Sequence, residues 1–294
     1  MIEFGPLGLG TAPLGGLYEA VDDVTAHAVV ERAWELGVRF FDTAPFYGSG
    51  LAERRLGEAL RGRPRDEFVL STKVGRLLRP GENAWHGAPE LEAYFDFSRD
   101  GVLRSIAASL DRLGLDRIDI VLVHDPDDHH DAAIAGAFPA LERLRDEGVV
   151  RAVGAGMNQT EMLCRFAREA DPDCFLVAGR YTLLDRSAAD ELLPLCEERG
   201  IAVIAGGVFN SGVLAGGGTY DYRPAPARIV ARARELEETC ARLGVPLAAA
   251  AVQFPRRHPV VASVLAGCSS PAEVEEDVRL STLEVPNALW AALA

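Results

Sequence analysis

RDGVLRSIAASLDRLGLDRIDIVLVH, residues 99–124, contains one complete helix-to-strand unit of this chain. Its first part, Arg99–Leu113, has the length and mixed polarity of an amphipathic helix. Gly114 follows that helix as the residue that commonly ends a helix in a left-handed conformation. Its last part, Ile118–His124, is a short apolar run rich in β-branched residues, which is typical of a buried strand. The stretch therefore predicts a helix that leads directly into a strand.

The same alternation continues in both directions along the chain. Six further runs have the composition of strands: Val38–Asp42, Phe68–Lys73, Val149–Gly154, Cys174–Ala178, Ile201–Ala205 and Val261–Leu265. Six further stretches have the pattern of helices: Val24–Leu36, Leu51–Leu60, Ala132–Glu147, Thr160–Ala170, Ser187–Arg199 and Ala227–Leu243. Helix ends are marked by Gly37, Gly148, Gly200 and Gly244, and Asp23 is the expected N-cap of the first helix.

This alternation predicts parallel strands joined by crossover helices. Leu7–Leu9 supplies an eighth strand, and eight units in 294 residues average about 37 residues each, which suits a (β/α)8 TIM barrel. A doubly wound open sheet is the alternative, but residues 8–13 do not complete its Gly-x-Gly-x-x-Gly turn. We find no Gly-, Pro- or Ser-rich linker, so we expect residues 1–294 to form a single domain.

Composition narrows the range of partners. Lys+Arg 30 against Asp+Glu 44 give a net charge of −14, which argues against nucleic acid and anionic membranes as partners. Five widely spaced cysteines without a Cys-x-x-Cys pair favour core thiols over disulfides or a metal site. We see no signal peptide and no apolar run long enough to span a membrane, so we expect a cytoplasmic protein without a bound metal.

Two connections are longer than packing requires, and both follow a predicted strand. Residues 75–98 include Trp85 and His86, whereas residues 206–226 include Phe209, Tyr220 and Tyr222. In a barrel, loops after strands form the C-terminal face, where active sites are built. We therefore expect these two aromatic-rich loops to shape a substrate pocket.

Four polar residues lie at or just after predicted strand ends: Asp42, Tyr47, Lys73 and His124. In a parallel barrel these ends converge on one rim. A Tyr hydroxyl has a pKa near 10, and a nearby Lys ammonium is expected to lower it. Asp42 would keep Lys73 charged, and His124 would orient the reacting oxygen. The four residues together form a plausible proton-transfer set.

The sequence resembles the aldo-keto reductase superfamily. The resemblance is carried by Phe41-Asp42-Thr43-Ala44 with Tyr47-Gly48, by Leu70–Val74, by Ser105–His124, and by Gly148–Gly154 with Asn158. It implies a (β/α)8 barrel, a nicotinamide dinucleotide cofactor and Tyr47 as general acid/base. Lys73 and Asp42 would tune Tyr47, His124 would orient the substrate oxygen, and Asn158 would hold the carboxamide.

The resemblance also implies further binding positions. Those expected around the cofactor are Thr11, Tyr181, Gly206, Phe209, Gly212, Leu214, Gly267, Ser269, Ser270, Glu273 and Asp277. Those expected around the substrate are Phe46, Trp85, His86 and Phe209.

Some positions depart from the wider family. Ala178 replaces the usual carboxamide-binding Gln, and Gly206 replaces the Tyr that stacks on the nicotinamide, so Phe209 is a candidate substitute. Gly267 and Glu273 replace the Lys and Arg that relatives use for the 2′-phosphate of NADP. A carboxylate there repels a phosphate and suits ribose hydroxyls, which favours NAD over NADP.

Within the superfamily, the motifs at residues 97–101, 124–127, 178–184 and 208–214 are similar to those of aldose dehydrogenases. This implies oxidation of the anomeric carbon of an aldose of the L-fucose, D-arabinose or L-galactose type to a lactone. A pyridoxal-oxidising branch looks similar, so pyridoxal, or another alcohol or carbonyl, is the alternative substrate. A non-catalytic, cofactor-sensing barrel is a remote alternative. The sequence gives no prediction of oligomeric state.

Overall fold

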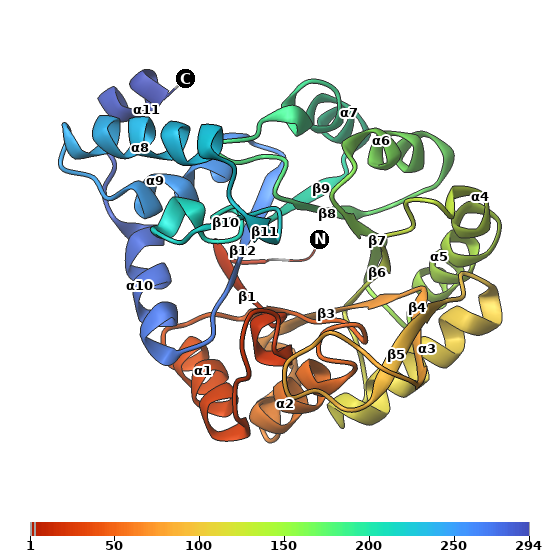
Figure 1. Cartoon of the computed structure of the whole chain (residues 1–294). Coiled ribbons are helices and arrows are strands. Elements are labelled where there is room, and N and C mark those ends of the chain that lie inside the picture. Colours follow the sequence, from red (N-terminus) through yellow and green to blue (C-terminus); the bar gives the residue numbers. More distant parts are fainter. Residues whose placement is uncertain (1, 3, 294) are drawn as a thin grey trace.

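The computed structural model describes residues 2 and 4–293. Eight parallel strands close into a barrel in the order β1-β12-β9-β8-β7-β6-β3-β2, and helices surround it (Figure 1). The barrel strands are β1 (Leu7–Gly10), β2 (Phe40–Asp42), β3 (Val69–Val74), β6 (Ile120–His124), β7 (Ala152–Met157), β8 (Cys174–Ala178), β9 (Ala202–Gly206) and β12 (Val261–Gly267). The predicted (β/α)8 barrel is confirmed.

Helices form the outer layer of the barrel. They are α1 (Asp23–Glu35), α2 (Leu51–Leu60), α3 (Arg99–Leu113), α4 (His130–Ala132), α5 (Phe138–Asp146), α6 (Thr160–Glu169), α7 (Leu192–Arg199), α8 (Ala227–Ala241), α9 (Leu247–Gln253), α10 (Pro271–Thr282) and α11 (Asn287–Leu293). A π-helical turn, Ala133–Ala137, joins α4 to α5. The predicted helix over residues 187–199 is interrupted, because a separate 3-10 turn over Ser187–Ala189 precedes α7.

Most predicted helix ends are placed correctly. Gly114 and Gly200 end α3 and α7 with φ angles of 63° and 70°, in the left-handed region that Gly adopts without strain. The N-cap of α1 is Asp22 and not Asp23, because the Asp22 carboxylate accepts a 2.7 Å hydrogen bond from the Thr25 backbone N–H.

One strand is shifted from its predicted position. The prediction was 149–154, whereas β7 spans Ala152–Met157 and pairs with β6 from Ile120↔Ala152 to His124↔Gly156. Val149 and Val150 donate their backbone N–H groups to the Leu144 carbonyl and so continue the end of α5. Their β-branched side chains made the sequence prediction start three residues early.

The barrel interior changes from apolar to polar along its axis. Its apolar part includes Phe40, Ile120, Leu122 and Ile204, with Phe4 packed edge-on against Phe40. A larger apolar layer fills the space between strands and helices, and the cysteines that the sequence placed in the core are indeed buried free thiols: Cys164, Cys174, Cys196, Cys240 and Cys268. Buried polar side chains at or near the carboxyl ends of the strands include Asp42, Lys73 and His124.

Both long connections contain short hairpins that the sequence did not predict. In the first, β4 (Arg76–Pro80) pairs antiparallel with β5 (Leu91–Phe95). In the second, β10 (Thr219–Tyr220) pairs with β11 (Arg223–Pro224). Each hairpin follows the carboxyl end of a barrel strand and therefore stands at the face where the polar side chains converge. No helix among residues 2 and 4–293 is long and apolar enough to cross a membrane.

Candidate active site

Lys73 and Asp42 form an ion pair inside the barrel rim. Lys73 Nζ lies 2.7 Å from Asp42 Oδ2 and also donates a 2.9 Å hydrogen bond to the Thr43 carbonyl. The other Asp42 oxygen accepts a 2.6 Å hydrogen bond from Ser71 Oγ. Adjacent strands β2 and β3 bring these residues together, since Asp42 is in register with Ser71. Both charges are therefore held by fixed hydrogen bonds in a buried site.

Tyr47 lies against this ion pair. Its ring centroid is 4.6 Å from Lys73 Nζ and 5.6 Å from the centroid of the His124 ring, which stands perpendicular to it. Tyr47 follows β2, Lys73 belongs to β3 and His124 ends β6. The three strand ends thus bring a phenol, an ammonium and an imidazole to one point, as the sequence predicted.

The pKa of Tyr47 moves in the direction opposite to the one expected from the sequence. Burial raises it well above its usual value, and the carboxylates of Asp42 and Asp125 add to this effect, whereas Arg76 opposes it. The Lys73 ammonium does not reverse the shift, because its charge is compensated by Asp42 at 2.7 Å. Tyr47 is therefore a neutral phenol at physiological pH.

His124 is buried and neutral. Burial lowers its pKa well below the usual value, and the cations of Lys73 and Arg76 lower it further. A neutral imidazole donates from one nitrogen and accepts at the other. His124 can therefore hold an oxygen atom by a hydrogen bond without transferring a proton to it.

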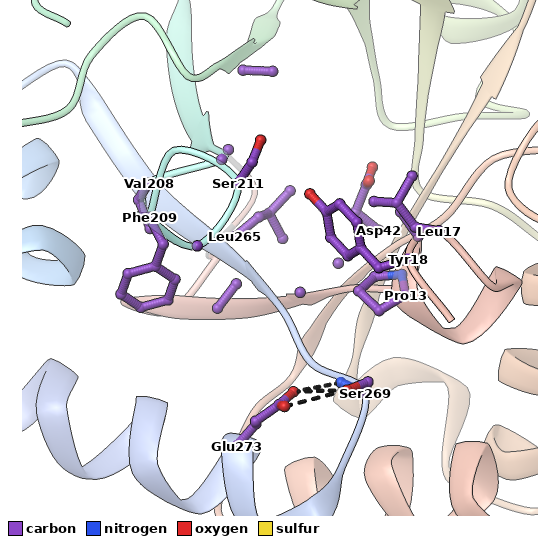
Figure 2. A pocket seen from close by; sticks show the side chains of 18 of the residues that line it. Pro13, Leu17, Tyr18, Asp42, Val208, Phe209, Ser211, Leu265, Ser269 and Glu273 are labelled. Atoms are coloured by element: carbon purple, nitrogen blue, oxygen red, sulfur yellow. Dashed lines mark hydrogen bonds between the residues drawn. The ribbon is translucent and has the colours of Figure 1, made fainter. Parts of the chain in front are cut away.

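A cavity of about 470 Å³ extends from Asp42 and Tyr47 across the barrel mouth (Figure 2). Tyr47 and Asp42 line one end of it, and Ser269, Glu273 and Asp277 line the other. Figure 2 shows Leu17 and Tyr18 on one side of the cavity, and Phe209 and Ser211 on the other. The cavity is therefore elongated and joins the polar rim to the start of α10.

Part of the floor of this cavity is made of glycines. A Cβ on Gly206 would lie 3.1 Å from Leu176 Cδ2, and one on Gly267 would lie 3.0 Å from Pro13 Cγ. Gly207 has a φ of +61°, which favours glycine. A bare backbone floor allows a long polar molecule to lie close to the strand ends, so these residues fit an extended dinucleotide.

The end of the cavity at α10 is acidic. The Glu273 carboxylate accepts a 2.7 Å hydrogen bond from the Ser269 backbone N–H and a 3.2 Å hydrogen bond from Ser269 Oγ (Figure 2). Burial raises the pKa of Asp277 to about 7, and the nearby Glu273 charge contributes to this shift. Within the described residues, no Lys, Arg or His side chain lines the cavity.

The predicted cofactor residues fall into two groups. Those that line the cavity are Gly206, Phe209, Gly212, Gly267, Ser269, Glu273 and Asp277. The others do not line the cavity. Thr11 donates to the Asp42 carbonyl, Asn158 donates to the Ala178 carbonyl, and Ser270 caps α10. Tyr181 packs on Phe254, and Leu214 is buried in the core.

The predicted substrate residues differ in position. Trp85 lies 6.0 Å from Tyr47 and 5.2 Å from Phe46 between ring centroids, so both aromatics pack beside Tyr47, although neither lines the cavity. His86 has an exposed side chain, and its backbone N–H donates to the Gly16 carbonyl. His86 therefore makes a structural contact through its backbone, and it does not contact the cavity.

Sequence reasoning missed several cavity residues. Leu17 and Tyr18 follow β1, and Ser211 lies in the loop after β9. The signal available was their position, since any residue in a loop after a barrel strand can reach the C-terminal face. Tyr222 was noted as a loop aromatic, and it also lines the cavity.

Comparisons with known proteins agree with this geometry. Residues 6–294 match the model of the Aldo/keto reductase family. The chain is 47% identical to a D-threo-aldose 1-dehydrogenase of a Pseudomonas species, over 98% of this chain and 92% of that protein. It is 43% identical to a pyridoxal 4-dehydrogenase of Microbacterium luteolum, over the same shares. An aldo-keto reductase structure from Bacillus halodurans superimposes with a TM-score of 0.79 at 28% identity, over 98% of this chain and 91% of that one. The chain therefore belongs to the aldo/keto reductase family and is an NAD(P)-dependent oxidoreductase.

Proposed function

We propose that this protein oxidises the anomeric carbon of an aldose to a lactone and uses NAD. The observation that carries the proposal is the meeting of Tyr47, His124 and the buried Lys73–Asp42 pair, of which Tyr47 and Asp42 line a cavity that is partly walled by glycines. The 47% identity to a D-threo-aldose 1-dehydrogenase supports the aldose as substrate.

The cofactor and the side chains have different roles in the reaction. A bound nicotinamide supplies a hydride acceptor for the carbon that is oxidised. The Tyr47 oxygen takes the proton of the anomeric hydroxyl, and in the reverse direction the phenol returns it. Because the pKa of Tyr47 is raised, its phenolate is a minor but strong base. Neutral His124 holds the substrate oxygen in place.

The Lys73–Asp42 pair positions Tyr47, and within this pair the Lys73 ammonium favours negative charge on Tyr47 while the Asp42 carboxylate opposes it. The ammonium lies over the Tyr47 ring at 4.6 Å from the centroid, and Asp42 and the Thr43 carbonyl fix it there. A positive charge held in a buried site favours the developing phenolate more than the same charge would in water. The Lys73 ammonium therefore lowers the energy barrier to proton transfer, and it does so without changing its own covalent state.

The preference for NAD rests on Glu273. Its carboxylate already accepts from the Ser269 N–H and hydroxyl, which are the donors that a phosphate would need at the start of α10. A 2′-phosphate would meet this carboxylate and Asp277 at the same end of the cavity. Ribose hydroxyls, in contrast, can donate to carboxylates. Glu273, Ser269 and Asp277 are thus proposed to face the adenosine ribose.

Pyridoxal is the second candidate substrate, because a pyridoxal 4-dehydrogenase is 43% identical over nearly the whole chain. An NAD-linked screen over L-fucose, D-arabinose, L-galactose, L-xylose and pyridoxal separates the two. We expect NADH formation with at least one aldose and a lactone as the product. Turnover of pyridoxal alone would identify pyridoxal, and not an aldose, as the substrate. Turnover with NADP alone would overturn the cofactor proposal.

A further inference from the structure

Asp125 places an additional carboxylate beside His124. It directly follows that residue at the end of β6, and its Oδ2 lies 3.6 Å from His124 Nε2. Its backbone has a φ of +41°, in the left-handed region that non-glycine residues rarely adopt. Strained backbone of this kind concentrates at functional sites, where the surrounding structure holds a side chain in a required position.

Arg76 holds the Asp125 side chain in place. Arg76 Nη2 donates a 2.7 Å hydrogen bond to Asp125 Oδ2, and the two side chains are 18% and 27% exposed. The guanidinium lies 4.5 Å from the centroid of the Phe46 ring and 5.1 Å from that of Phe95. The Arg76 guanidinium, which belongs to the hairpin of β4 and β5, is therefore held at the rim by these contacts. Its hydrogen bond fixes the orientation of the Asp125 carboxylate.

His124, Arg76 and Asp125 each have a polar atom that is free to form a further hydrogen bond. Among the described residues, the buried atoms His124 Nδ1 and Arg76 Nε have no hydrogen-bond partner. The Arg76 hydrogen bond engages only Oδ2 of Asp125, so Oδ1 is left to accept another one. Because buried polar groups are normally paired, these atoms leave hydrogen bonds available to a polar molecule beside the reacting groups.

We propose that Asp125, held by Arg76, is a specificity residue that accepts a hydrogen bond from a hydroxyl on the carbon next to the reacting one. The inference rests on the proposed function, in which His124 holds the oxygen of the reacting carbon. Oδ2 of Asp125 is 3.6 Å from His124 Nε2, so a hydroxyl on the neighbouring carbon of a substrate held by His124 would come within reach of the Asp125 carboxylate. The substrate class is therefore a 2-hydroxy aldehyde in its cyclic form, in contrast to a simple aldehyde or alcohol.

A carboxylate selects such substrates in two ways. It gains a charge-assisted hydrogen bond with a substrate that carries the hydroxyl. It also penalises a substrate that lacks the hydroxyl, because the partly buried carboxylate then loses water without gaining a partner. If Asp125 and Arg76 only linked the hairpin to β6, they would stabilise the rim but would not distinguish the two substrates.

The experiment compares the best aldose with its 2-deoxy form on the same enzyme preparation, with NAD. The ratio of the two kcat/KM values does not depend on the fraction of folded protein. For the natural chain we expect this ratio to favour the 2-hydroxy sugar at least tenfold. Asp125→Asn should bring the ratio close to one, mainly by raising KM for the 2-hydroxy sugar. Asp128→Asn, an exposed change three residues further on, should leave the ratio unchanged.

Arg76→Lys provides a second variant, which keeps the positive charge but loses the planar guanidinium group. It should lower the ratio to an intermediate value, and it keeps the test valid if Asp125→Asn does not fold. An unchanged ratio in either folded variant overturns the specificity role of Asp125 while leaving the proposed function intact. Absence of NADH formation by the natural chain with both sugars overturns the proposed function and this inference together.

Discussion

Lys73 Nζ and Asp42 Oδ2 lie 2.7 Å apart where their side chains are only 1% and 3% exposed. Breaking a buried ion pair on one side leaves an unpaired charge in a poorly solvated site. We therefore expect Asp42→Ala to lower the free energy of unfolding by about 3–5 kcal/mol, and the double change Asp42→Leu with Lys73→Met to restore most of it. Urea unfolding followed by circular dichroism measures both values.

The control for this prediction is an exposed ion pair. Arg54 and Glu58 are separated by 3.2 Å and both are 42% exposed, so Glu58→Ala should change the free energy of unfolding by less than about 1 kcal/mol. Equal losses for Asp42→Ala and Glu58→Ala would contradict the view that the Lys73–Asp42 pair is a buried, tightly coupled unit.

Tyr47→Phe removes the only proton-transferring atom of that ring and keeps its packing against Trp85 and His124. General acid–base catalysis typically contributes a factor of about 10²–10⁴, so we expect kcat to fall by that amount. NADH binding, measured by fluorescence titration, should stay within about twofold, since one hydroxyl of a long cavity is removed. A variant that keeps more than half of its turnover would remove Tyr47 from its role.

The raised pKa of Tyr47 also predicts how the rate depends on pH. Oxidation needs the phenolate and reduction needs the phenol. Because burial places the pKa above its usual value near 10, the phenolate fraction grows with pH across the whole physiological range. Oxidation should therefore accelerate steadily from pH 6 to 10, about tenfold per pH unit where proton transfer limits the rate, while reduction should not. A plateau of the oxidation rate near pH 7 would show that the tyrosine pKa is lowered.

Glu273→Gln tests the choice of cofactor. The change keeps the hydrogen bonds to Ser269 within reach and removes a negative charge from the acidic end of the cavity. We expect kcat/KM for NADP to rise about tenfold or more, because a repulsion of roughly 1.4 kcal/mol corresponds to that factor. Glu276→Gln is the matched control, since Glu276 pairs with Arg279 on the exposed side of α10. An equal gain in both variants would mean that net charge, rather than Glu273, sets the preference.

Much of the framework is predictable from the sequence because its signals are local. Apolar runs and helix-ending glycines such as Gly114 and Gly200 locate strands and helices. Parallel strands then bring Asp42, Lys73 and His124 to one rim without further information. The shifted start of β7 shows the limit of this approach, because the contact of Val149 with Leu144 outweighs its β-branched side chain.

Features that depend on burial or on distant pairing are not predictable in this way. The direction of the Tyr47 pKa shift follows from desolvation, which only the packed structure reveals. Arg76 and Asp125 are separated by 49 positions, and an unpredicted hairpin brings them together. Leu17 and Tyr18 reach the cavity through a loop that has no distinctive sequence pattern.

The most direct test of the account is the ratio of kcat/KM for the best aldose to that for pyridoxal, measured with NAD and with identification of the product. The account predicts that this ratio exceeds ten and that the sugar product is a lactone. A ratio below one, or NADH formation with pyridoxal alone, would contradict it.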